Sequence, residues 1–218
     1  MLKAVILDFD GTIGDTLALC LEAFKSAIEP LAGRTFTEEE IIATFGPSEE
    51  GTIAKLVLDQ AASGVAGYLR EYERLHVKYD KPFPGILELL RTLKKRGLLV
   101  ALVTGKGRYS CDISLAAYGL TDFFDAVETG SALGPCKPVG LRSVLTRFKL
   151  LPQEAVYVGD TTSDVAACQE VGIPVIAAAW ASTANPEQLA ATKPDRLCRS
   201  ITQLHDTLED MMTTADRT

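Results

Sequence analysis

The amino-acid sequence predicts an α/β protein whose core is a parallel, Rossmann-like sheet. From residue 86 onward, helical patterns alternate with short apolar segments, as they do in a series of βαβ units. The chain also opens on an apolar segment, residues 3–7, in which Ala, Val, Ile and Leu follow Lys3 without a further charge. A segment of this kind is typical of a strand that is buried on both faces. We therefore expect the first strand to join the later strands in one parallel sheet.

The region that follows the first strand shows helical periodicity and no strand pattern. We expect helices over 16–29, 37–44, 49–60 and 65–78. Thr37 begins a capping-box pattern, and residues 81–85, which contain two prolines and a glycine, mark a boundary. The sequence thus predicts two domains, an α/β core formed by 1–14 and 82–218 and an all-helical cap formed by 15–81.

The rest of the chain divides into amphipathic helices and the apolar strands that follow them. The expected strands cover 98–103, 126–128, 155–158 and 173–178. The expected helices cover 86–96, 109–118, 139–149 and 162–171, and a last helix contains Ile201 to Met211. Pro138 suits the first turn of a helix. The tail over 212–218 is small and polar, and we expect it to fray.

The composition is that of an ordinary soluble globular protein. The 218 residues carry a net charge of −7 without a Lys/Arg stripe, which argues against a nucleic-acid partner. No apolar segment is long enough to cross a bilayer, and the chain does not begin like a signal peptide, so we expect no membrane partner and a cytoplasmic location. Five scattered cysteines without a C-x-x-C pair indicate reduced thiols rather than a zinc site. We expect a monomer or a homodimer.

Two carboxylates, Asp8 and Asp10, follow the first predicted strand one residue apart. Crowding two like charges is unfavourable unless a proton or a cation compensates them, and a metal ion is the simplest solution. Gly11 allows the backbone to turn sharply, so that its amides face an anion. An ordinary Asp-Gly turn after a strand is the alternative that these residues alone leave open.

Three further polar segments lie at the ends of predicted strands or at the start of a predicted helix. They are Thr104-Gly105-Lys106, Lys137-Pro138 and Gly159–Asp164. Ligands bind beyond the carboxyl ends of the strands in an open parallel sheet, so we expect these segments to share one rim with Asp8 and Asp10. Each segment by itself has an ordinary structural explanation, such as a turn residue or an acidic residue at a helix N-terminus.

Together and in this order, the segments resemble the motifs of the haloacid dehalogenase superfamily, whose members transfer phosphoryl groups to an aspartate. The D-x-D-G-T motif stands at Asp8–Thr12, the strand-end Thr at Thr104, the Lys-Pro pair at Lys137-Pro138 and G-D-x-x-x-D at Gly159–Asp164. A Trp just after the strand at 173–178, here Trp180, also resembles the phosphoglycolate-phosphatase-like branch of this superfamily. Each motif alone is weak, but four in the family's order are specific.

The resemblance implies a role for each matching residue. Asp8 would be the nucleophile that forms an aspartyl-phosphate, and Asp10 would act as the acid and then the base. Mg²⁺, which prefers oxygen ligands, would be held by Asp8, the backbone carbonyl of Asp10 and Asp160, with Asp164 as a direct or water-mediated ligand. Lys137 would contact both the nucleophile and the phosphate. The phosphate-binding residues would be Gly11, Thr12, Thr104, Gly105 and Lys137.

The function expected from this resemblance is Mg²⁺-dependent hydrolysis of small phosphomonoesters. The partner is then a small phosphorylated metabolite, with 2-phosphoglycolate as the first candidate. A sugar phosphomutase similar to β-phosphoglucomutase, an inorganic pyrophosphatase and a non-catalytic phospho-ligand sensor are the alternatives. Asp10 argues against dehalogenases and phosphonate hydrolases, which lack this second acid. The intact set of Asp8, Asp10, Lys137 and Asp160 argues against the sensor, because a binding protein needs neither a nucleophile nor an acid.

Two departures from the phosphoglycolate phosphatase pattern bear on the substrate. They are Gly105, where Asn is frequent, and Val139-Gly140, which lacks the common second Pro. Neither position touches a reacting group. The residues that choose the substrate are expected in the cap, around Phe45–Ser48.

The remaining polar residues receive a structural interpretation. Lys106 and Arg108 are interpreted as a solvated basic turn, with contact to the substrate as the alternative. Cys136 is expected to be a small, half-buried residue. His76, His205 and Tyr109 are expected at the surface or in packing contacts.

Overall fold

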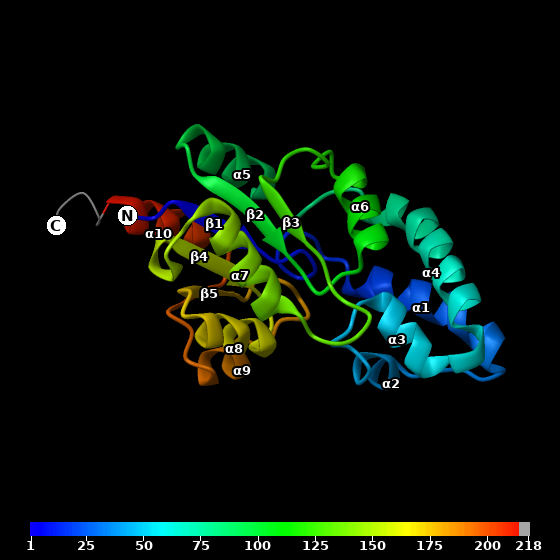
Figure 1. Cartoon of the computed structure of the whole chain (residues 1–218). Coiled ribbons are helices and arrows are strands. Elements are labelled where there is room, and N and C mark those ends of the chain that lie inside the picture. The colour runs from blue at the N-terminus through cyan, green and yellow to red at the C-terminus, as the bar shows by residue number, and fades with distance from the viewer. Residues whose placement is uncertain (214–218) are drawn as a thin grey trace.

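The computed structural model describes residues 1–213, and their centre is a sheet of six parallel strands (Figure 1). The strands are β1 (Ala4–Leu7), β2 (Leu99–Val103), β3 (Ala126–Glu128), β4 (Ala155–Gly159), β5 (Val175–Ala178) and β6 (Arg196–Cys198). Their order in space is β3-β2-β1-β4-β5-β6, and in the register Leu7 lies opposite Leu102 of β2 and Val158 of β4. The predicted α/β class with a Rossmann-like parallel sheet is confirmed.

Alternate side chains of the central strand face two separate hydrophobic clusters, one on each face of the sheet. Val5 and Leu7 pack with α5 (Ile86–Lys95), α6 (Arg108–Ala117) and α10 (Ile201–Thr213). Ala4 and Ile6 pack with α7 (Lys137–Phe148) and α8 (Thr162–Val171) on the other face. All four residues of β1 are buried, as the uncharged segment predicts.

Residues 15–81 hold helices and no strand, and we call this segment the cap and the rest of the described chain the core. Its helices are α1 (Leu17–Ala32), α2 (Glu38–Ile42), α3 (Glu49–Leu56), η1 (Leu58–Gln60), α4 (Ala61–Leu75) and η2 (His76–Tyr79). All of them except η1 contribute to one hydrophobic cluster, in which Phe24 of α1 packs against Tyr68 of α4, with ring centres 4.6 Å apart. The cap lies beyond the carboxyl ends of the strands, and α4 packs beside α6 (Figure 1).

The structure differs from the predicted elements at their edges. Two short elements, the edge strand β6 and the helix α9 (Pro186–Ala191), were not predicted from the sequence. The first helix is expected to end at residue 29, whereas α1 continues through Pro30 to Ala32. A proline in the last turn removes only one helical hydrogen bond, and Gly33, with a φ of 65°, ends the helix.

Two further expectations concern the start of α7 and the tail. Helix α7 begins at Lys137, two residues earlier than expected, with Pro138 in its first turn. Helix α10 includes Met212 and Thr213, and the rest of the tail that we expect to fray lies outside the described residues.

None of the helices within residues 1–213 has the length and apolar character needed to cross a membrane. All five cysteines are free thiols, as their scattered positions predict.

Candidate active site

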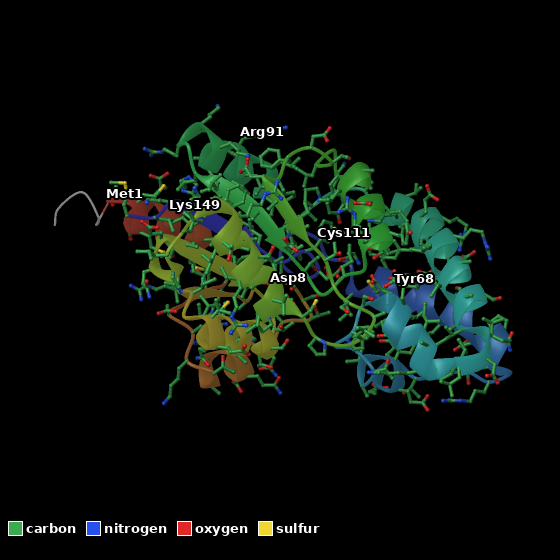
Figure 2. The ribbon with its side chains drawn as sticks, viewed as in Figure 1. Met1, Asp8, Tyr68, Arg91, Cys111 and Lys149 are labelled. Atoms are coloured by element: carbon green, nitrogen blue, oxygen red, sulfur yellow. The ribbon has the colours of Figure 1, made fainter. Side chains whose placement is uncertain are left out.

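The carboxyl end of β1 places Asp8 at the edge of the sheet that faces Tyr68 of the cap (Figure 2). Asp8 is 5 % exposed, and its Oδ1 accepts a hydrogen bond from the backbone N–H of Phe9 at 2.7 Å. Its Oδ2 accepts a hydrogen bond from Nζ of Lys137 at 2.5 Å. Each oxygen of this nearly buried carboxylate therefore has a donor, and the two donors fix the direction of the side chain.

Lys137 joins Asp8 to a second carboxylate, that of Asp164. Nζ of Lys137 also donates to Oδ1 of Asp164, and the hydroxyl of Tyr157 lies 3.1 Å from the same oxygen. Asp164 is fully buried in the first turn of α8. Its Oδ2 accepts two hydrogen bonds from Thr161, one from the hydroxyl at 2.7 Å and one from the backbone N–H of Thr161 at 3.0 Å. Asp164 therefore completes the N-terminal cap of a helix and anchors the lysine at the same time.

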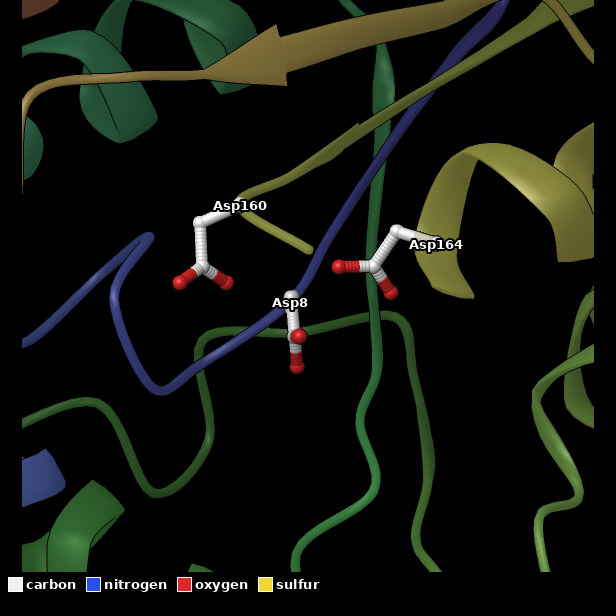
Figure 3. Close-up of side chains that lie close together, drawn as sticks. All are labelled: Asp8, Asp160 and Asp164. Atoms are coloured by element: carbon white, nitrogen blue, oxygen red, sulfur yellow. The ribbon is translucent and has the colours of Figure 1, made fainter. Parts of the chain in front are cut away.

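Asp8, Asp160 and Asp164 bring carboxylate oxygens within 4.8 Å of one another (Figure 3). Oδ1 of Asp160 is buried and has no hydrogen-bond partner among the described residues. A buried carboxylate oxygen without a partner is unfavourable, and a divalent cation that prefers oxygen ligands relieves it. Gly11 has a φ of 73°, and a Cβ there would lie 2.0 Å from Oδ2 of Asp160, so glycine is what allows the turn to approach this carboxylate. The residues present fit Mg²⁺.

Burial, together with the neighbouring negative charges, raises the pKa of Asp8 and of Asp160. Burial raises the pKa of Asp8 to about 6, although the charge of Lys137 opposes the shift. Burial, with the charges of Asp8 and Asp164, raises the pKa of Asp160 well above its usual range. Burial acts to lower the pKa of Lys137, but the charges of Asp164 and Asp8 outweigh it and raise the pKa above the usual value. Three carboxylates thus surround one fixed cation, and a second cation would balance the cluster.

Asp10 lies in the turn after β1 and contacts the beginning of the cap. Its Oδ1 accepts a hydrogen bond from the hydroxyl of Thr16 and lies 3.2 Å from Nζ of Lys106. Sγ of Cys20, in α1, lies 4.0 Å from the same oxygen. Burial raises the pKa of Cys20 to about 12, so this thiol stays protonated. Asp10 is therefore held from both the cap and the core.

The interpretation of Lys106 as part of a solvated basic turn is wrong. The Lys106 side chain is fully buried, and its ammonium lies 4.6 Å from the ring centre of Tyr72 in the cap. Burial acts to lower its pKa, but Asp10 and the other acidic groups around it outweigh this and raise the pKa well above the usual value. Arg108 does match the solvated interpretation, because its side chain is 62 % exposed and pairs with Asp112 at 2.9 Å.

Glu49, the first residue of α3, lies in the same cluster as Asp10 and Lys106 and was not predicted from the sequence. Its side chain is 11 % exposed, and its Oε1 lies 3.5 Å from Nζ of Lys106. Oε1 also accepts from the hydroxyl of Ser110 at 2.6 Å, and Oε2 accepts from the backbone N–H of Gly107. The hydroxyl of Tyr68 lies 3.4 Å from Oε1. The only signal in the sequence is that Glu49 directly follows the loop Phe45–Ser48.

The turn after β2 brings Thr104 and Gly105 to the same rim. The hydroxyl of Thr104 accepts a hydrogen bond from the backbone N–H of Lys106 at 3.3 Å. A Cβ on Gly130 would lie 1.9 Å from the carbonyl oxygen of Gly105, whereas a Cβ on Gly105 would meet nothing within 4 Å. The turn is therefore braced on one side by the loop at Gly130 and open on the other, where a phosphate is expected.

Trp180 contacts the backbone of Thr12 in the turn that follows β1. The indole N–H of Trp180 donates to the backbone carbonyl of Thr12 at 3.2 Å. Thr12 is fully buried, and its hydroxyl has no partner among the described residues. Trp180 therefore supports the backbone of the Asp8–Thr12 motif, and the expected contact of Thr12 with phosphate stays a prediction.

The other singled-out residues lie apart from this rim or pack against it. His76 is buried with its Nε2 3.0 Å from the hydroxyl of Ser114, whereas Tyr109 is exposed and His205 is half-buried. Cys136 is half-buried, as expected. The loop Phe45–Ser48 packs on the core, where the backbone N–H of Ser48 donates to the carbonyl of Ser131 at 2.9 Å. Its part in choosing a substrate stays a prediction.

The chain is similar to known proteins over nearly its whole length. A family model described as haloacid dehalogenase-like hydrolase matches residues 5–178. A curated relative, pyrophosphatase PpaX from Bacillus thuringiensis, is 27 % identical over 212 residues, which cover 96 % of this chain and 98 % of the relative.

Solved structures share the same fold. A hydrolase from Pseudomonas syringae superposes with a TM-score of 0.80 at 21 % identity, covering 95 % of this chain and 98 % of that one. A haloacid dehalogenase-like family protein from Streptococcus pneumoniae gives a TM-score of 0.77 at 24 % identity, with the same coverage of 95 % and 98 %.

We expect the metal-free protein to lose stability through Asp8 as the pH rises. The pKa of Asp8 is about 6 in the folded chain against the ordinary 3.8, so between these values the folded chain keeps a proton that the unfolded chain has lost. The stabilisation is complete below the lower value and is lost as the pH passes the higher one, an effect of roughly 1–3 kcal/mol.

Urea denaturation in chelator, at pH values across this window, measures the effect. The Asp8→Asn variant is the control because its amide does not titrate. We expect the stability of the wild type relative to this variant to fall with rising pH, and a constant difference would contradict the raised pKa.

Proposed function

We propose, from the premise that this chain belongs to the haloacid dehalogenase-like hydrolase family, that it hydrolyses small phosphomonoesters through an aspartyl-phosphate on Asp8. The observation that carries the proposal is the setting of Asp8. It is a nearly buried carboxylate at the end of the central strand, paired with Lys137 and beside acidic residues that fit Mg²⁺. A nucleophile, a fixed cation and a metal site in contact are what phosphoryl transfer requires.

In the first step, a carboxylate oxygen of Asp8 attacks phosphorus, and the bond between phosphorus and the alcohol oxygen breaks. The hydrogen bonds from Phe9 and Lys137 hold this carboxylate in place before the substrate arrives. Holding a nucleophile in its reactive position removes much of the entropy cost of bringing the two groups together. Burial of Asp8 keeps water from competing for the oxygen that attacks.

Asp10 supplies the proton that the leaving alcohol oxygen needs. In the second step it accepts a proton from the water that attacks the phosphorus of the aspartyl-phosphate, which frees phosphate and restores Asp8. The contacts of its Oδ1 with the Thr16 hydroxyl and with Lys106 hold the side chain beside the cap. Asp10 is thus held between the core and the cap, on the side from which we propose that the alcohol leaves.

Lys137 and the turn after β2 would bind the phosphoryl oxygens. Lys137 stays charged beside Asp8, so it offsets the repulsion between the nucleophile and a phosphate dianion. The hydroxyl of Thr104 and the amides of the turn, together with the turn at Gly11, would donate to the same oxygens. Such preorganised donors stabilise the charge that develops in the transition state.

Mg²⁺ would be held by Asp8, Asp160 and the backbone carbonyl of Asp10, with Asp164 as a direct or water-mediated ligand. When bound, it would neutralise charge on the phosphoryl group and on Asp8. The unpartnered oxygen of Asp160 is the observation that supports this assignment. The carboxylate of Asp164 already accepts hydrogen bonds from Thr161 and Lys137, which favours binding of the metal through a water molecule rather than directly.

Two substrates are named as first candidates. The motifs suggest 2-phosphoglycolate, and the curated relatives named pyrophosphatase support pyrophosphate as a second. A phosphate-release assay on a panel of esters with Mg²⁺ tests both. A sugar phosphate that is isomerised without net release of phosphate would identify a mutase, and tight binding without turnover would identify a sensor. We also propose a cytoplasmic location, which the free cysteines support.

Replacing Asp8 with Asn should abolish phosphatase activity, by at least about a thousandfold in kcat, because the amide keeps the shape but is not an anionic nucleophile. Phosphate release under saturating substrate measures the loss, and a melting curve confirms that the variant is folded. Near-normal turnover by the folded variant would overturn the proposed mechanism.

Replacing Asp10 with Asn should slow esters with basic leaving groups more than esters with acidic ones. An alkoxide needs a proton as it departs, whereas an aryl oxide departs without one, so we expect a steeper dependence of kcat/KM on leaving-group pKa in the variant. A series of alkyl and aryl phosphates measures that slope. Equal losses across the series would remove Asp10 from the role of acid.

Chelation with EDTA should stop turnover, and added Mg²⁺ should restore it. Ca²⁺ should restore less than about a tenth of the activity, because its larger coordination shell suits a different ligand geometry. Phosphate release after metal replacement measures this, with a melting curve in each metal as the control for folding. Full activity in the chelator would refute the metal assignment.

A further inference from the structure

A second charged cluster lies where the cap meets the core, beside Asp10. It consists of Asp10, Lys106 and Glu49, and we call it the interface cluster. Nζ of Lys106 lies 3.2 Å from Oδ1 of Asp10 and 3.5 Å from Oε1 of Glu49. The two carboxylates thus share one cation. If Asp10 protonates the leaving alcohol, as proposed above, Glu49 would lie on the side of the site that receives the rest of the alcohol.

The positive charge of Lys106 is balanced by the carboxylates within the interface cluster. Its side chain is 0 % exposed, the ring centre of Tyr72 lies 4.6 Å from Nζ, and Sγ of Cys20 lies 3.7 Å from it. An anion on the substrate would therefore have to displace a carboxylate to reach this ammonium. Two carboxylates against one ammonium also leave the interface cluster with a net negative charge whenever Asp10 is ionised.

Glu49 is bound too firmly to be displaced easily. Besides Lys106, its carboxylate has donors in the backbone N–H of Gly107 and the hydroxyl of Ser110. Gly107 is what allows this approach, because a Cβ there would lie 2.7 Å from Oε2 of Glu49 and 2.6 Å from Oε2 of Glu50. A second cap carboxylate therefore lies at the same turn and adds to the negative charge.

From this geometry we propose that the enzyme takes phosphomonoesters whose leaving alcohol is uncharged or carries an ammonium group, and that Glu49 is the residue that disfavours a second anion. The proposal rests on the proposed phosphatase function and names its substrate class. A carboxylate can accept hydrogen bonds from hydroxyl and ammonium groups but repels an anion. The two first candidates, 2-phosphoglycolate and pyrophosphate, each carry a second anionic group, so this inference ranks both of them below neutral and ammonium-bearing esters as substrates.

Three esters that share a two-carbon backbone test this directly. They are 2-phosphoglycolate, ethylene glycol monophosphate and ethanolamine phosphate, which differ in carrying a carboxylate, a hydroxyl and an ammonium group. With Mg²⁺ at neutral pH, we expect kcat/KM for the hydroxyl and ammonium esters to exceed that for 2-phosphoglycolate by at least about tenfold. A preference for 2-phosphoglycolate would overturn the proposal.

Two variants ask whether Glu49 causes the preference. Glu49→Gln keeps the size and an acceptor oxygen but removes the charge, and it should reduce the preference by about five- to tenfold. Glu49→Lys should reverse it. The matched control is Glu71→Gln, which removes a cap glutamate whose partner is Arg74, 2.8 Å away on the surface of α4, and it should leave the preference unchanged.

Melting curves and turnover of an aryl phosphate show whether each variant is folded and competent. If Glu49→Lys fails to fold, Glu49→Gln carries the test, and an unchanged preference in that folded variant would overturn the role of Glu49. If the wild type hydrolyses none of the three esters nor the aryl phosphate, the proposed function itself fails and this inference with it. Turnover with the opposite charge preference refutes the substrate class alone.

Discussion

The pairing of Lys137 with Asp8 and Asp164 is the interaction on which the rest of the site depends. It ties together the end of β1 and the first turns of α7 and α8, which lie far apart in the chain. Burying the charges carries a desolvation cost that good geometry offsets, and removing one partner would leave an unpaired buried charge at a cost of about 3–5 kcal/mol. Because Asp164 also caps α8 through Thr161, the lysine is fixed by the same contacts that begin the helix.

The site divides its positive charge between two buried lysines with different tasks. Lys137 belongs to the core and pairs with Asp8, the proposed nucleophile, whereas Lys106 bridges Asp10 of the core and Glu49 of the cap. The first lysine leaves three carboxylates with too little positive charge, which is the condition for a divalent cation. The second is paired with the carboxylates of Asp10 and Glu49, so its charge is balanced within the interface cluster.

The sequence allowed the core side of the site to be predicted well, because parallel strands end at one edge of a sheet. Asp8, Lys137, Asp160 and Asp164 were expected on one rim, and the structure brings all four together. Their roles in catalysis and metal binding remain predictions.

The interface cluster could not be predicted, since the burial of Lys106 and the contact with Glu49 depend on how the cap docks against the turn after β2. No local pattern encodes that long-range fit. The two core elements that were not predicted lack an apolar pattern: β6 is Arg196-Leu197-Cys198 with Asp195 and Arg199 on either side, and α9 has only six residues.

The most direct test of the central claim is to look for the phosphoryl group on Asp8. The wild-type enzyme would be mixed with Mg²⁺ and an ester that it hydrolyses, and the reaction would be quenched in acid within milliseconds. The protein would then be digested and its peptides analysed by mass spectrometry. If Asp8 is the nucleophile, the peptide containing Asp8 gains one phosphoryl group, and reduction with borohydride marks that residue. Rapid turnover with no phosphorylated peptide, or a phosphoryl group on another residue, would contradict the aspartyl-phosphate mechanism.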